Sequence, residues 1–380
     1  MNKIAFWSPH ISHHIATLKA VLNSCEAISK FSKKNNTCDL INAYGEWTEH
    51  QNKIKDLNIR LINLTKKNFF HSIPKGNYIK SRISFIFIAI ISIFPLVRYL
   101  KKDKPKYLIV HLITSMPLIL LIFFKFETKF VLRISGFPKL NIFRKLLWKI
   151  ISKKLHLVFC PTEETRNSLI ELGVFSEDKI VFLPDPIVKI STINFKKRKN
   201  EELNLPFKDY FVSVGRLSKQ KNKIFLINFF KNNFENENLL IIGDGELKDE
   251  LSFKIKSNNL QKRIILIPYK KNIFNIIANS KAVLVSSLWE DPGFVMIESA
   301  AIGKVVVISD CPSGPKEFID FNKNGFIFKS NNEESFLESL NSFFKKSDHE
   351  IKKIKVNAKK KSKIYTQFNH YKILKKNLDF

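Results

Sequence analysis

The chain has 380 residues and a formal net charge of +30, with 64 lysine and arginine residues against 34 aspartate and glutamate residues. Hydrophobic residues make up 44% of it, which excludes a largely disordered chain and suits two α/β domains of about 150–200 residues each. The cysteines have neither a CxxC nor a metal-ligand spacing, so neither a disulfide framework nor a zinc site is expected; they are Cys25, Cys38, Cys160 and Cys311.

The positive charge comes almost wholly from lysine, because only nine of the 64 basic residues are arginine. The abundance of Lys, Ile, Asn and Phe is typical of AT-rich coding, so part of the charge reflects codon usage. Such a surface still attracts polyanions, either an anionic bilayer or a nucleic acid. Nucleic-acid readers favour arginine and interleave aromatic residues with basic ones. We therefore expect an anionic membrane surface and no specific nucleic acid, with a merely solvated basic surface as the alternative.

The first half of the chain alternates predicted strands and helices. Met1 to His10 forms a short apolar strand and a turn, without the apolar run and cleavage site of a signal peptide. The alternation predicts a parallel sheet with helices on both faces. The strands are expected at Lys3–Trp7, Leu40–Ala43, Tyr107–His111, Phe130–Ile134, Leu157–Pro161 and Ile180–Leu183, and helices at Ile15–Phe31, Ile142–Lys153 and Glu163–Leu172.

The longest apolar stretch, Ile83 to Val97, is shorter than the roughly 20 residues that a transmembrane helix needs. Pro95 and the flanking Arg82 and Arg98 also weaken a spanning interpretation. Two alternatives remain, a core helix and a helix that lies shallowly in a membrane surface. We favour the core helix.

A second α/β alternation follows a lysine-rich and turn-rich segment. Its strands are expected at Tyr210–Val214, Leu239–Ile242, Ile264–Ile267, Ala282–Val285, Val305–Ile308 and Gly325–Phe328. The predicted organisation is an N-terminal Rossmann-like domain (1–187), a linker (188–209), a C-terminal Rossmann-like domain (210–349) and a basic C-terminal helix (350–380) that packs back toward the N-terminal domain.

The first candidate site segment runs from Val214 to Asn222. Gly215 ends a predicted strand, and Arg216 and Lys221 precede an apolar helix. Two cations are thus expected at the carboxyl edge of a parallel sheet, where open α/β folds bind ligands. A guanidinium forks onto phosphate oxygens and an ammonium supplies a point charge. We interpret Lys219 and Lys223 only as parts of a basic loop.

The second segment is Gly243-Asp244-Gly245-Glu246-Leu247. It begins like a dinucleotide fingerprint, but Lys248 occupies the place of the third glycine. We interpret it as a tight turn beside the ligand rather than as part of a hydride-transfer site.

The third segment runs from Ser286 to Ser299 and carries the sharpest signal. Glu290 lies in a loop after a predicted strand, and Glu298 lies in the second turn of a helix that opens near Gly293. Glycine lets the backbone approach a ligand, and the free N–H groups of Phe294 and Val295 make an anion site at the helix start. Two surface carboxylates are the alternative, weakened by the apolar neighbours.

These segments together resemble retaining GT-B glycosyltransferases of the large family 4, also called group 1. Glu290 and Glu298 are similar to its E-x7-E motif, and Gly215-Arg216-Leu217 with Lys221 to its G-R-L-x-x-x-K segment. The turn at Gly243 is similar to its G-x-G-x-L turn, and Cys311–Glu317 to its next glycine-centred loop. The match is dense over roughly residues 205–345 and loose over the first half.

The resemblance implies two facing Rossmann-like domains with a donor-binding cleft between them, an N-terminal acceptor domain (1–187) and a C-terminal nucleotide-sugar-binding domain (210–349). It implies a nucleotide sugar whose diphosphate is held by Arg216, Lys221 and the amides of Gly293–Val295. Glu290 would contact donor-sugar hydroxyls and Glu298 the ribose, while main-chain groups around Tyr269 would recognise the base. The family works without a metal, and the sequence has no DxD-type carboxylate pair.

The sequence departs from the family in two places. Ser12-His13-His14-Ile15 stands where the family often has Gly-Gly, and Glu290-Asp291-Pro292-Gly293 where it often reads E-G-F-G. His111, at a strand end, matches the family's histidine near the transferred sugar, with a core histidine as the alternative.

We therefore expect a cytoplasmic, metal-independent, retaining hexosyl- or N-acetylhexosaminyltransferase without a cofactor, peripheral on the inner face of the plasma membrane. Its acceptor would be a glycan or a polyprenyl- or other lipid-linked glycan in O-antigen, capsule or lipopolysaccharide synthesis. The alternatives are a nucleotide-sugar epimerase of the same fold and a basic nucleic-acid-binding protein. Scarce arginine and the Glu290/Glu298 pair argue against the last.

Overall fold

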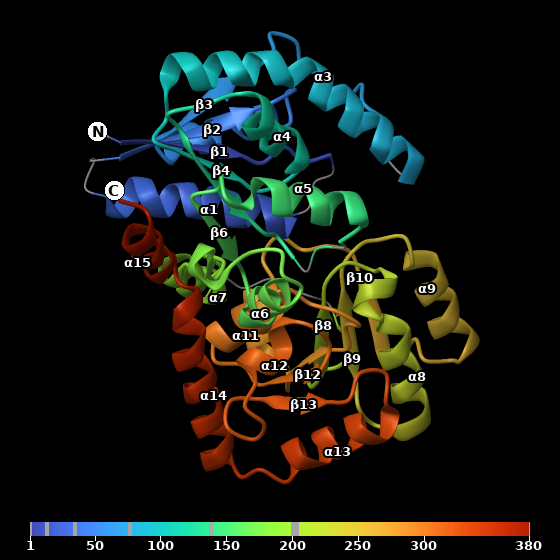
Figure 1. Cartoon of the computed structure of the whole chain (residues 1–380). Helices are drawn as coiled ribbons and strands as arrows, with labels where there is room; N and C mark the ends of the chain where they lie inside the picture. Colours follow the sequence, from blue (N-terminus) through green and yellow to red (C-terminus); the bar gives the residue numbers. More distant parts are fainter. Residues whose placement is uncertain are drawn as a thin grey trace. The chain divides into compact units, whose positions relative to one another are not determined.

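The computed structural model describes residues 2–11, 15–32, 36–74, 78–136, 138, 140–198 and 205–379. The chain divides into two α/β units (Figure 1). The first unit comprises Met1–Pro186 and Gln367–Phe380, and the second comprises Ile187–Thr366. Each has a parallel sheet flanked by helices, which confirms the predicted pair of Rossmann-like folds.

The sheet of the first unit has the strand order β3-β2-β1-β4-β5-β6-β7, and its neighbouring strands are parallel. The order reverses between β1 and β4, and ligands of open α/β sheets bind at the carboxyl ends of the strands flanking such a point. The strands are β1 (Asn2–Trp7), β2 (Asn36–Asn42), β3 (Ile59–Asn63), β4 (Tyr107–Val110), β5 (Lys129–Arg133), β6 (Leu157–Cys160) and β7 (Ile180–Phe182).

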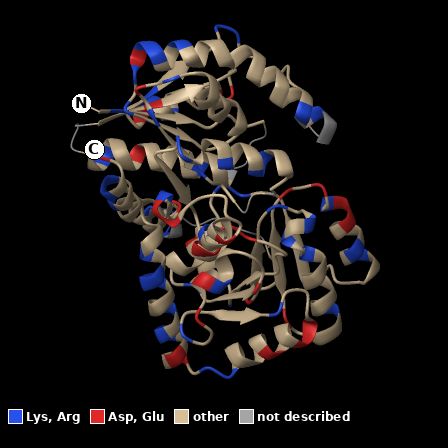
Figure 2. Cartoon of the chain, in the orientation of Figure 1, with Lys and Arg blue, Asp and Glu red and all other residues tan. Residues whose placement is uncertain are grey.

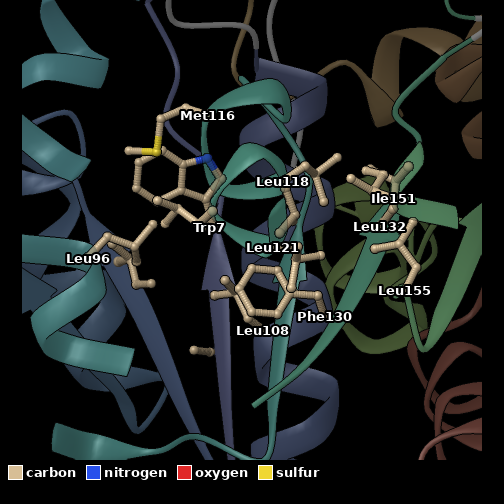
Figure 3. Packing of buried hydrophobic residues seen from close by; sticks show 14 of the residues in the cluster. Trp7, Leu96, Leu108, Met116, Leu118, Leu121, Phe130, Leu132, Ile151 and Leu155 are labelled. Carbon is tan, nitrogen blue, oxygen red and sulfur yellow. The ribbon is translucent and has the colours of Figure 1, made fainter. Parts of the chain in front are cut away.

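Two helical layers cover this sheet, one on each face, and the side chains of β1 point alternately toward the two layers. Ala5 and Trp7 face one apolar cluster and Ile4 and Phe6 the other, as expected for alternating side chains on a strand. Figure 3 shows the first cluster, in which Trp7 and Leu108 meet side chains from the helices above them. That layer contains α3 (Tyr78–Asp103), α4 (Ser115–Phe123), α5 (Ile142–Ser152) and α6 (Glu163–Glu171), and the opposite layer α1 (Ile15–Phe31), α2 (Gln51–Asp56) and α15 (Gln367–Asn377).

The apolar stretch Ile83 to Val97 lies within α3, which is 26 residues long. The apolar stretch has the expected length, but the helix that contains it is longer, because it also includes residues before Ile83 and after Val97. By length and composition alone, Lys80–Asp103 would suffice to cross a membrane, with a third of its most apolar window (33%) buried in the protein. The preferred interpretation as a core helix holds for one face only, on which Ile88, Leu96 and Leu100 are buried.

The sheet of the second unit has the strand order β10-β9-β8-β11-β12-β13 and is also parallel. Its order reverses between β8 and β11, which marks the carboxyl edge there as the candidate ligand site. The strands are β8 (Phe211–Val214), β9 (Leu239–Ile242), β10 (Ile264–Ile267), β11 (Val283–Val285), β12 (Val306–Ser309) and β13 (Phe326–Phe328). The helices are α7 (Ile190–Arg198), α8 (Lys223–Asn233), α9 (Lys248–Ser257), α10 (Phe274–Asn279), α11 (Phe294–Ala301), α12 (Gly314–Phe318), α13 (Glu333–Phe344) and α14 (Asp348–Ser362).

The chain passes between the units twice, at Pro186–Ile187 and at Thr366–Gln367, so the predicted linker lies within the second unit. The predicted linker 188–209 contains α7, whose Ile193 is buried in the core of the second unit, while residues 199–204 lie outside the described ranges. The predicted C-terminal helix is divided into α14 in the second unit and α15 in the first. Helix α15 packs on α1, where His370 Nδ1 donates to Pro184 O at 2.8 Å and Ser24 Oγ lies 2.8 Å from His370 Nε2.

Candidate functional site

The candidate site lies at the carboxyl edge of the second sheet, where the loops after β8, β11 and β12 are joined by hydrogen bonds. Ser286 Oγ donates to the carbonyls of Lys221 and Asn222 at 3.1 and 2.9 Å. Gln220 Nε2 donates to the carbonyl of Trp289 at 2.9 Å. The segments predicted to carry the chemistry are therefore joined by hydrogen bonds from side chains of one loop to the backbone of the other.

Glu290 is the centre of this assembly. Its Oε1 accepts hydrogen bonds from Lys221 Nζ and from Ser287 Oγ, each at 2.6 Å. Its backbone N–H donates to Pro312 O and its carbonyl accepts from Ser313 N, both at 2.6 Å. The side chain is 7% exposed, so the alternative of a surface carboxylate is wrong. A carboxylate whose Oε1 accepts two hydrogen bonds, on a backbone that is itself hydrogen-bonded, has a fixed orientation, which a group that positions a substrate needs.

Glu298 lies on α11, eight positions after Glu290 along the chain, and is 6% exposed. Glu290 thus lies in a loop and Glu298 on a helix, as the sequence predicts. Gly293 precedes α11 with φ +96°, a left-handed conformation that favours glycine. The first N–H groups of α11, at Phe294 and Val295, have no acceptor within the helix itself and form an anion-binding geometry.

Arg216 and Lys221 occupy different environments on the loop after β8. Arg216 is exposed, whereas the ammonium of Lys221 is bound to Glu290. An ammonium has three donors, so Lys221 retains the capacity to donate to a phosphate while it holds the carboxylate. Both cations lie on the loop after β8, at the carboxyl edge of the sheet, and their role as a diphosphate clamp stays a prediction.

The Gly243–Leu247 turn is packed backbone to backbone against the loop after β8. Leu217 N donates to Asp244 O at 2.9 Å, and Leu247 N donates to Leu217 O at 3.0 Å. A Cβ at Gly243 would collide with Gly215 O, and one at Gly245 with Leu217 O. The glycines of this turn thus allow two loops to meet closely, and they fix the position of Gly215 and Arg216.

Tyr269 follows β10 and is half exposed, with its N–H donating to Asp244 Oδ2 at 2.9 Å. This contact ties the segment predicted to recognise the base to the same turn.

Lys223 corrects the sequence analysis, which treated it as part of a basic loop. Its side chain is buried, and Nζ donates to Ser213 Oγ at 2.5 Å. Burial lowers the pKa of Lys223 to about 7, with a further decrease from the charge of Lys221 and an opposing increase from Glu290. The sequence also did not predict the contact of Ser287 with Glu290, because only its position three residues before Glu290 indicated it.

His111 belongs to the first unit, where it follows β4 at the reversal point of that sheet. Its Nδ1 lies 3.2 Å from Ser8 Oγ. Burial, and secondarily the charge of Arg133, lowers the pKa of His111 to about 3, so the ring is neutral at pH 7. Arg133 itself forms a buried ion pair with Asp185.

Two further expectations concern metals and the first loop. Among the described residues, no group of three or more His, Cys, Asp and Glu side chains is arranged to hold a metal ion. Ser12, His13 and His14, which stand where the resembling family often has Gly-Gly, lie outside the described residues.

Comparisons with known proteins show similarities in sequence and in fold. Residues 194–361 match the family model described as glycosyl transferases group 1, which is less than half of the chain. An uncharacterized glycosyltransferase of Methanocaldococcus jannaschii is 30% identical over 247 residues, which cover 60% of this chain and 61% of the relative. A Campylobacter jejuni enzyme is 29% identical over 226 residues, 59% of this chain and 60% of the relative; it is the N-acetylgalactosamine-N,N'-diacetylbacillosaminyl-diphospho-undecaprenol 4-alpha-N-acetylgalactosaminyltransferase.

The matched regions thus span about three fifths of the length of these two relatives. Among solved structures, Anabaena HepE in complex with UDP superposes with a TM-score of 0.73 over all of both chains (100% each), at 14% identity. The chain has the GT-B fold, with two Rossmann-like α/β units of parallel sheet.

Proposed function

We propose that the protein is a glycosyltransferase that moves a sugar from a nucleotide-diphosphate sugar to a glycan or lipid-linked glycan acceptor. The observation that carries the proposal is the buried Glu290, fixed by Lys221 and Ser287 at the reversal point of the second sheet and four residues before the start of α11. The GT-B fold and the group 1 match over residues 194–361 support it.

In the proposed complex, the diphosphate lies against Arg216, Lys221 and the N–H groups of Phe294 and Val295. Gly215 and Gly293 allow the backbone to approach it. Glu290 holds hydroxyls of the donor sugar, Glu298 the ribose, and the main chain near Tyr269 the base. Arg216, Lys221 and the helix start then neutralise the charge that develops on the departing diphosphate, so that no metal and no cofactor is required.

We propose that transfer retains the configuration at the anomeric carbon. An acceptor hydroxyl oxygen bonds to the anomeric carbon from the face that the diphosphate leaves. The bond between that carbon and the phosphate oxygen breaks, and this phosphate oxygen takes the proton of the acceptor hydroxyl. His111, neutral at pH 7, acts beside the transferred sugar as a hydrogen-bonding group rather than as a cation.

The biological setting is proposed from the relatives. The Campylobacter relative transfers N-acetylgalactosamine to a sugar carried on diphospho-undecaprenol, as its name states. By analogy, we place this protein in surface polysaccharide synthesis as a hexosyl- or N-acetylhexosaminyltransferase. It would act in the cytoplasm, peripheral on the inner face of the plasma membrane, on a polyprenyl- or other lipid-linked acceptor.

A panel of nucleotide sugars and nucleoside diphosphates tests the donor class, because a ligand that binds only the folded state raises the melting temperature. The best donor is then incubated with lipid-linked acceptors, and the anomeric configuration of the product is determined. Absence of stabilisation by every nucleotide would overturn the proposal. Conversion of the donor sugar without acceptor would indicate an epimerase instead.

Arg216→Ala tests the diphosphate clamp directly. We expect it to weaken nucleoside-diphosphate and nucleotide-sugar binding equally, by about 1.5–3 kcal/mol for one charge-assisted contact. Calorimetry measures both affinities, and Lys219→Ala, which removes an exposed cation of the same loop, is the matched control. Unchanged affinity in a folded Arg216→Ala variant would remove Arg216 from the clamp.

A further inference from the structure

The outer face of α3 carries an apolar stripe that the fold leaves uncovered. Ile83, Ile86, Ile90 and Phe94 recur at helical spacing and share one side of the helix. Their exposed fractions are 51%, 62%, 67% and 78%, so exposure increases toward Phe94. Single exposed apolar residues are ordinary on protein surfaces, but a continuous stripe marks a contact surface.

Cationic residues lie at both ends of this stripe. Arg82 precedes it, and Arg98, Lys101 and Lys102 follow it. Figure 2 shows the middle of α3 without charged residues and basic residues toward its ends. The acidic residue of the helix, Asp103, is bound by Lys3 at 3.2 Å and by Arg60 at 3.4 Å, so its charge is compensated.

Helix α5, in the same layer, repeats the pattern. Ile142, Leu146 and Ile150 are exposed at intervals of one helical turn. A row of lysines follows the same spacing three positions further along the chain, at Lys145, Lys149 and Lys153. The starts of α3 and α5 are near one another, since the charge of Arg82 contributes, after burial, to a lowered pKa of Arg144.

The inner face of α3 is fixed in the first unit. Ile88, Leu96 and Leu100 belong to the core that covers the sheet. Tyr99 Oη donates to the buried carboxylate of Asp39 at 2.5 Å. Crossing a bilayer would require these contacts to break, so the helix can meet a membrane only along its outer side.

We propose that the outer faces of α3 and α5 dock the protein on an anionic bilayer surface, with Ile86, Ile90 and Phe94 inserted below the headgroups. In-plane amphipathic helices combine an apolar stripe with flanking Lys and Arg in this way, and anionic lipid adds attraction for each cation. A hollow of about 440 Å³ beside Phe94, lined in part by Arg98 and Lys102, offers room for a headgroup phosphate.

The positive charges on this surface favour an anionic bilayer over a second copy of the chain as its binding partner. A symmetric contact between two such faces would bring rows of lysine and arginine together, and like charges at close range are repulsive. The bilayer supplies the opposite charge. The inference does not rest on the proposed sugar transfer, because vesicle binding is measured without donor or acceptor.

Co-sedimentation with vesicles tests the surface. The full chain is mixed with vesicles of phosphatidylcholine, or of phosphatidylcholine with phosphatidylglycerol, at two salt concentrations. We expect strong binding only to the mixed vesicles, and a steep decrease with salt because exposed charges are screened within about 8–10 Å at physiological ionic strength.

Ile86→Ser/Ile90→Ser/Phe94→Ser should lower the partition coefficient at least about tenfold, since inserted apolar area drives binding. Phe253→Ser, at an exposed phenylalanine of α9, is the control and should bind like the wild type.

Two double charge-reversal variants distinguish the effect of this surface from the effect of the total charge of the protein. Arg98→Glu/Lys102→Glu and Lys352→Glu/Lys353→Glu change the net charge equally, but the second pair lies on α14 in the other unit. We expect a several-fold loss for the first pair and little change for the second. Equal loss in both pairs, wild-type binding by the triple serine variant, or equal binding to neutral and mixed vesicles would each overturn the proposal. Circular dichroism confirms that each variant is folded.

Insertion gives a second measure. Phe94→Trp should show blue-shifted emission and quenching by brominated acyl chains in mixed vesicles, whereas Phe253→Trp should show neither. A Trp at position 94 that remains solvent-like on bound vesicles would overturn the insertion of α3.

Discussion

At the scale of single residues, Glu290 makes hydrogen bonds to other site residues through both its side chain and its backbone. It binds Lys221 and Ser287 through its side chain and Ser313 through its backbone, so it connects the loops after β8, β11 and β12. A substitution that keeps its shape but removes its charge separates the structural from the chemical contribution.

Glu290→Gln should lower turnover by orders of magnitude, because ionised acceptors make hydrogen bonds about twice as strong as neutral ones. Nucleoside-diphosphate affinity should stay the same or increase, since the variant removes the carboxylate that now compensates the charge of Lys221. Steady-state transfer and calorimetry on the folded variant measure the two effects. Glu298→Gln is the counterpart, with the loss expected mainly in nucleotide affinity. Near-normal turnover in Glu290→Gln would remove its proposed catalytic role.

Lys223 gives a pH-dependent prediction. Its folded pKa of about 7 lies below the usual value of 10.5, so the unfolded chain binds more protons between these two pH values. The wild type should therefore gain stability as pH rises through this window, by at most about 1.4 kcal/mol per pH unit. Lys223→Met should flatten this dependence, because methionine cannot titrate. Melting temperatures from pH 6.5 to 9.5 measure it, with the exposed Lys231→Met on the same helix as control. Parallel curves for wild type and Lys223→Met would contradict the shift.

Among the site residues, the sequence indicated those defined by local spacing but not those defined by burial. Arg216, Lys221 and Glu290 follow or precede recognisable strand ends and glycines. Lys223 faces inward on α8 whereas Lys219 is exposed in the turn before it, and a sequence rich in lysine offers no sign of that difference. Ser287 acquires a role only because the loop folds its hydroxyl onto Glu290.

At the scale of elements, α15 depends on a neutral histidine. His370 donates through Nδ1 to Pro184 O and is positioned to accept from Ser24 Oγ at Nε2, which suits the uncharged ring. Burial, then the charge of Arg133, lowers the pKa of His370 to about 3. Between the usual value of 6.5 and about 3 the unfolded chain binds more protons, so stability falls as pH decreases.

His370→Gln should therefore reduce the loss of stability between pH 6.5 and 4, since the amide keeps a donor and an acceptor but does not titrate. The slope should decrease rather than vanish, because His111 has a similarly lowered pKa. Thermal melts of the variant and of the control His349→Gln, at an exposed residue of α14, measure this change. An unchanged slope in His370→Gln would show that this ring is not the acid-sensitive group.

Most strands could be predicted because parallel strands buried on both faces are short continuous apolar runs. The prediction missed β3, an edge strand whose Arg60 interrupts the apolar pattern and forms an ion pair with Asp39. It also underestimated α3, because a helix continues past its apolar residues where lysines can still point to solvent. Which face of α3 is covered depends on the sheet beneath it, and no local pattern contains that information.

At the scale of the whole molecule, the positive charge bears on how the reaction proceeds. Cations at the donor site would make a divalent metal unnecessary. We expect transfer to persist at full rate in excess EDTA, measured with the donor found in the nucleotide-sugar panel. Activity that EDTA abolishes and that Mg²⁺ or Mn²⁺ restores would contradict the metal-independent mechanism.

The return of the chain to the first unit has a consequence for folding during synthesis on the ribosome. Helix α1 presents Leu18, Val21 and Cys25 to a cluster that is completed by Leu374 of α15 and by Leu378, which follows α15. All of Ile187–Thr366 must be translated before α15 emerges, which takes roughly 10–40 s at 5–20 residues per second. During that interval the nascent first unit exposes an apolar groove. A stop codon or protease cut just after Thr366 would leave the second unit whole and the first one permanently open.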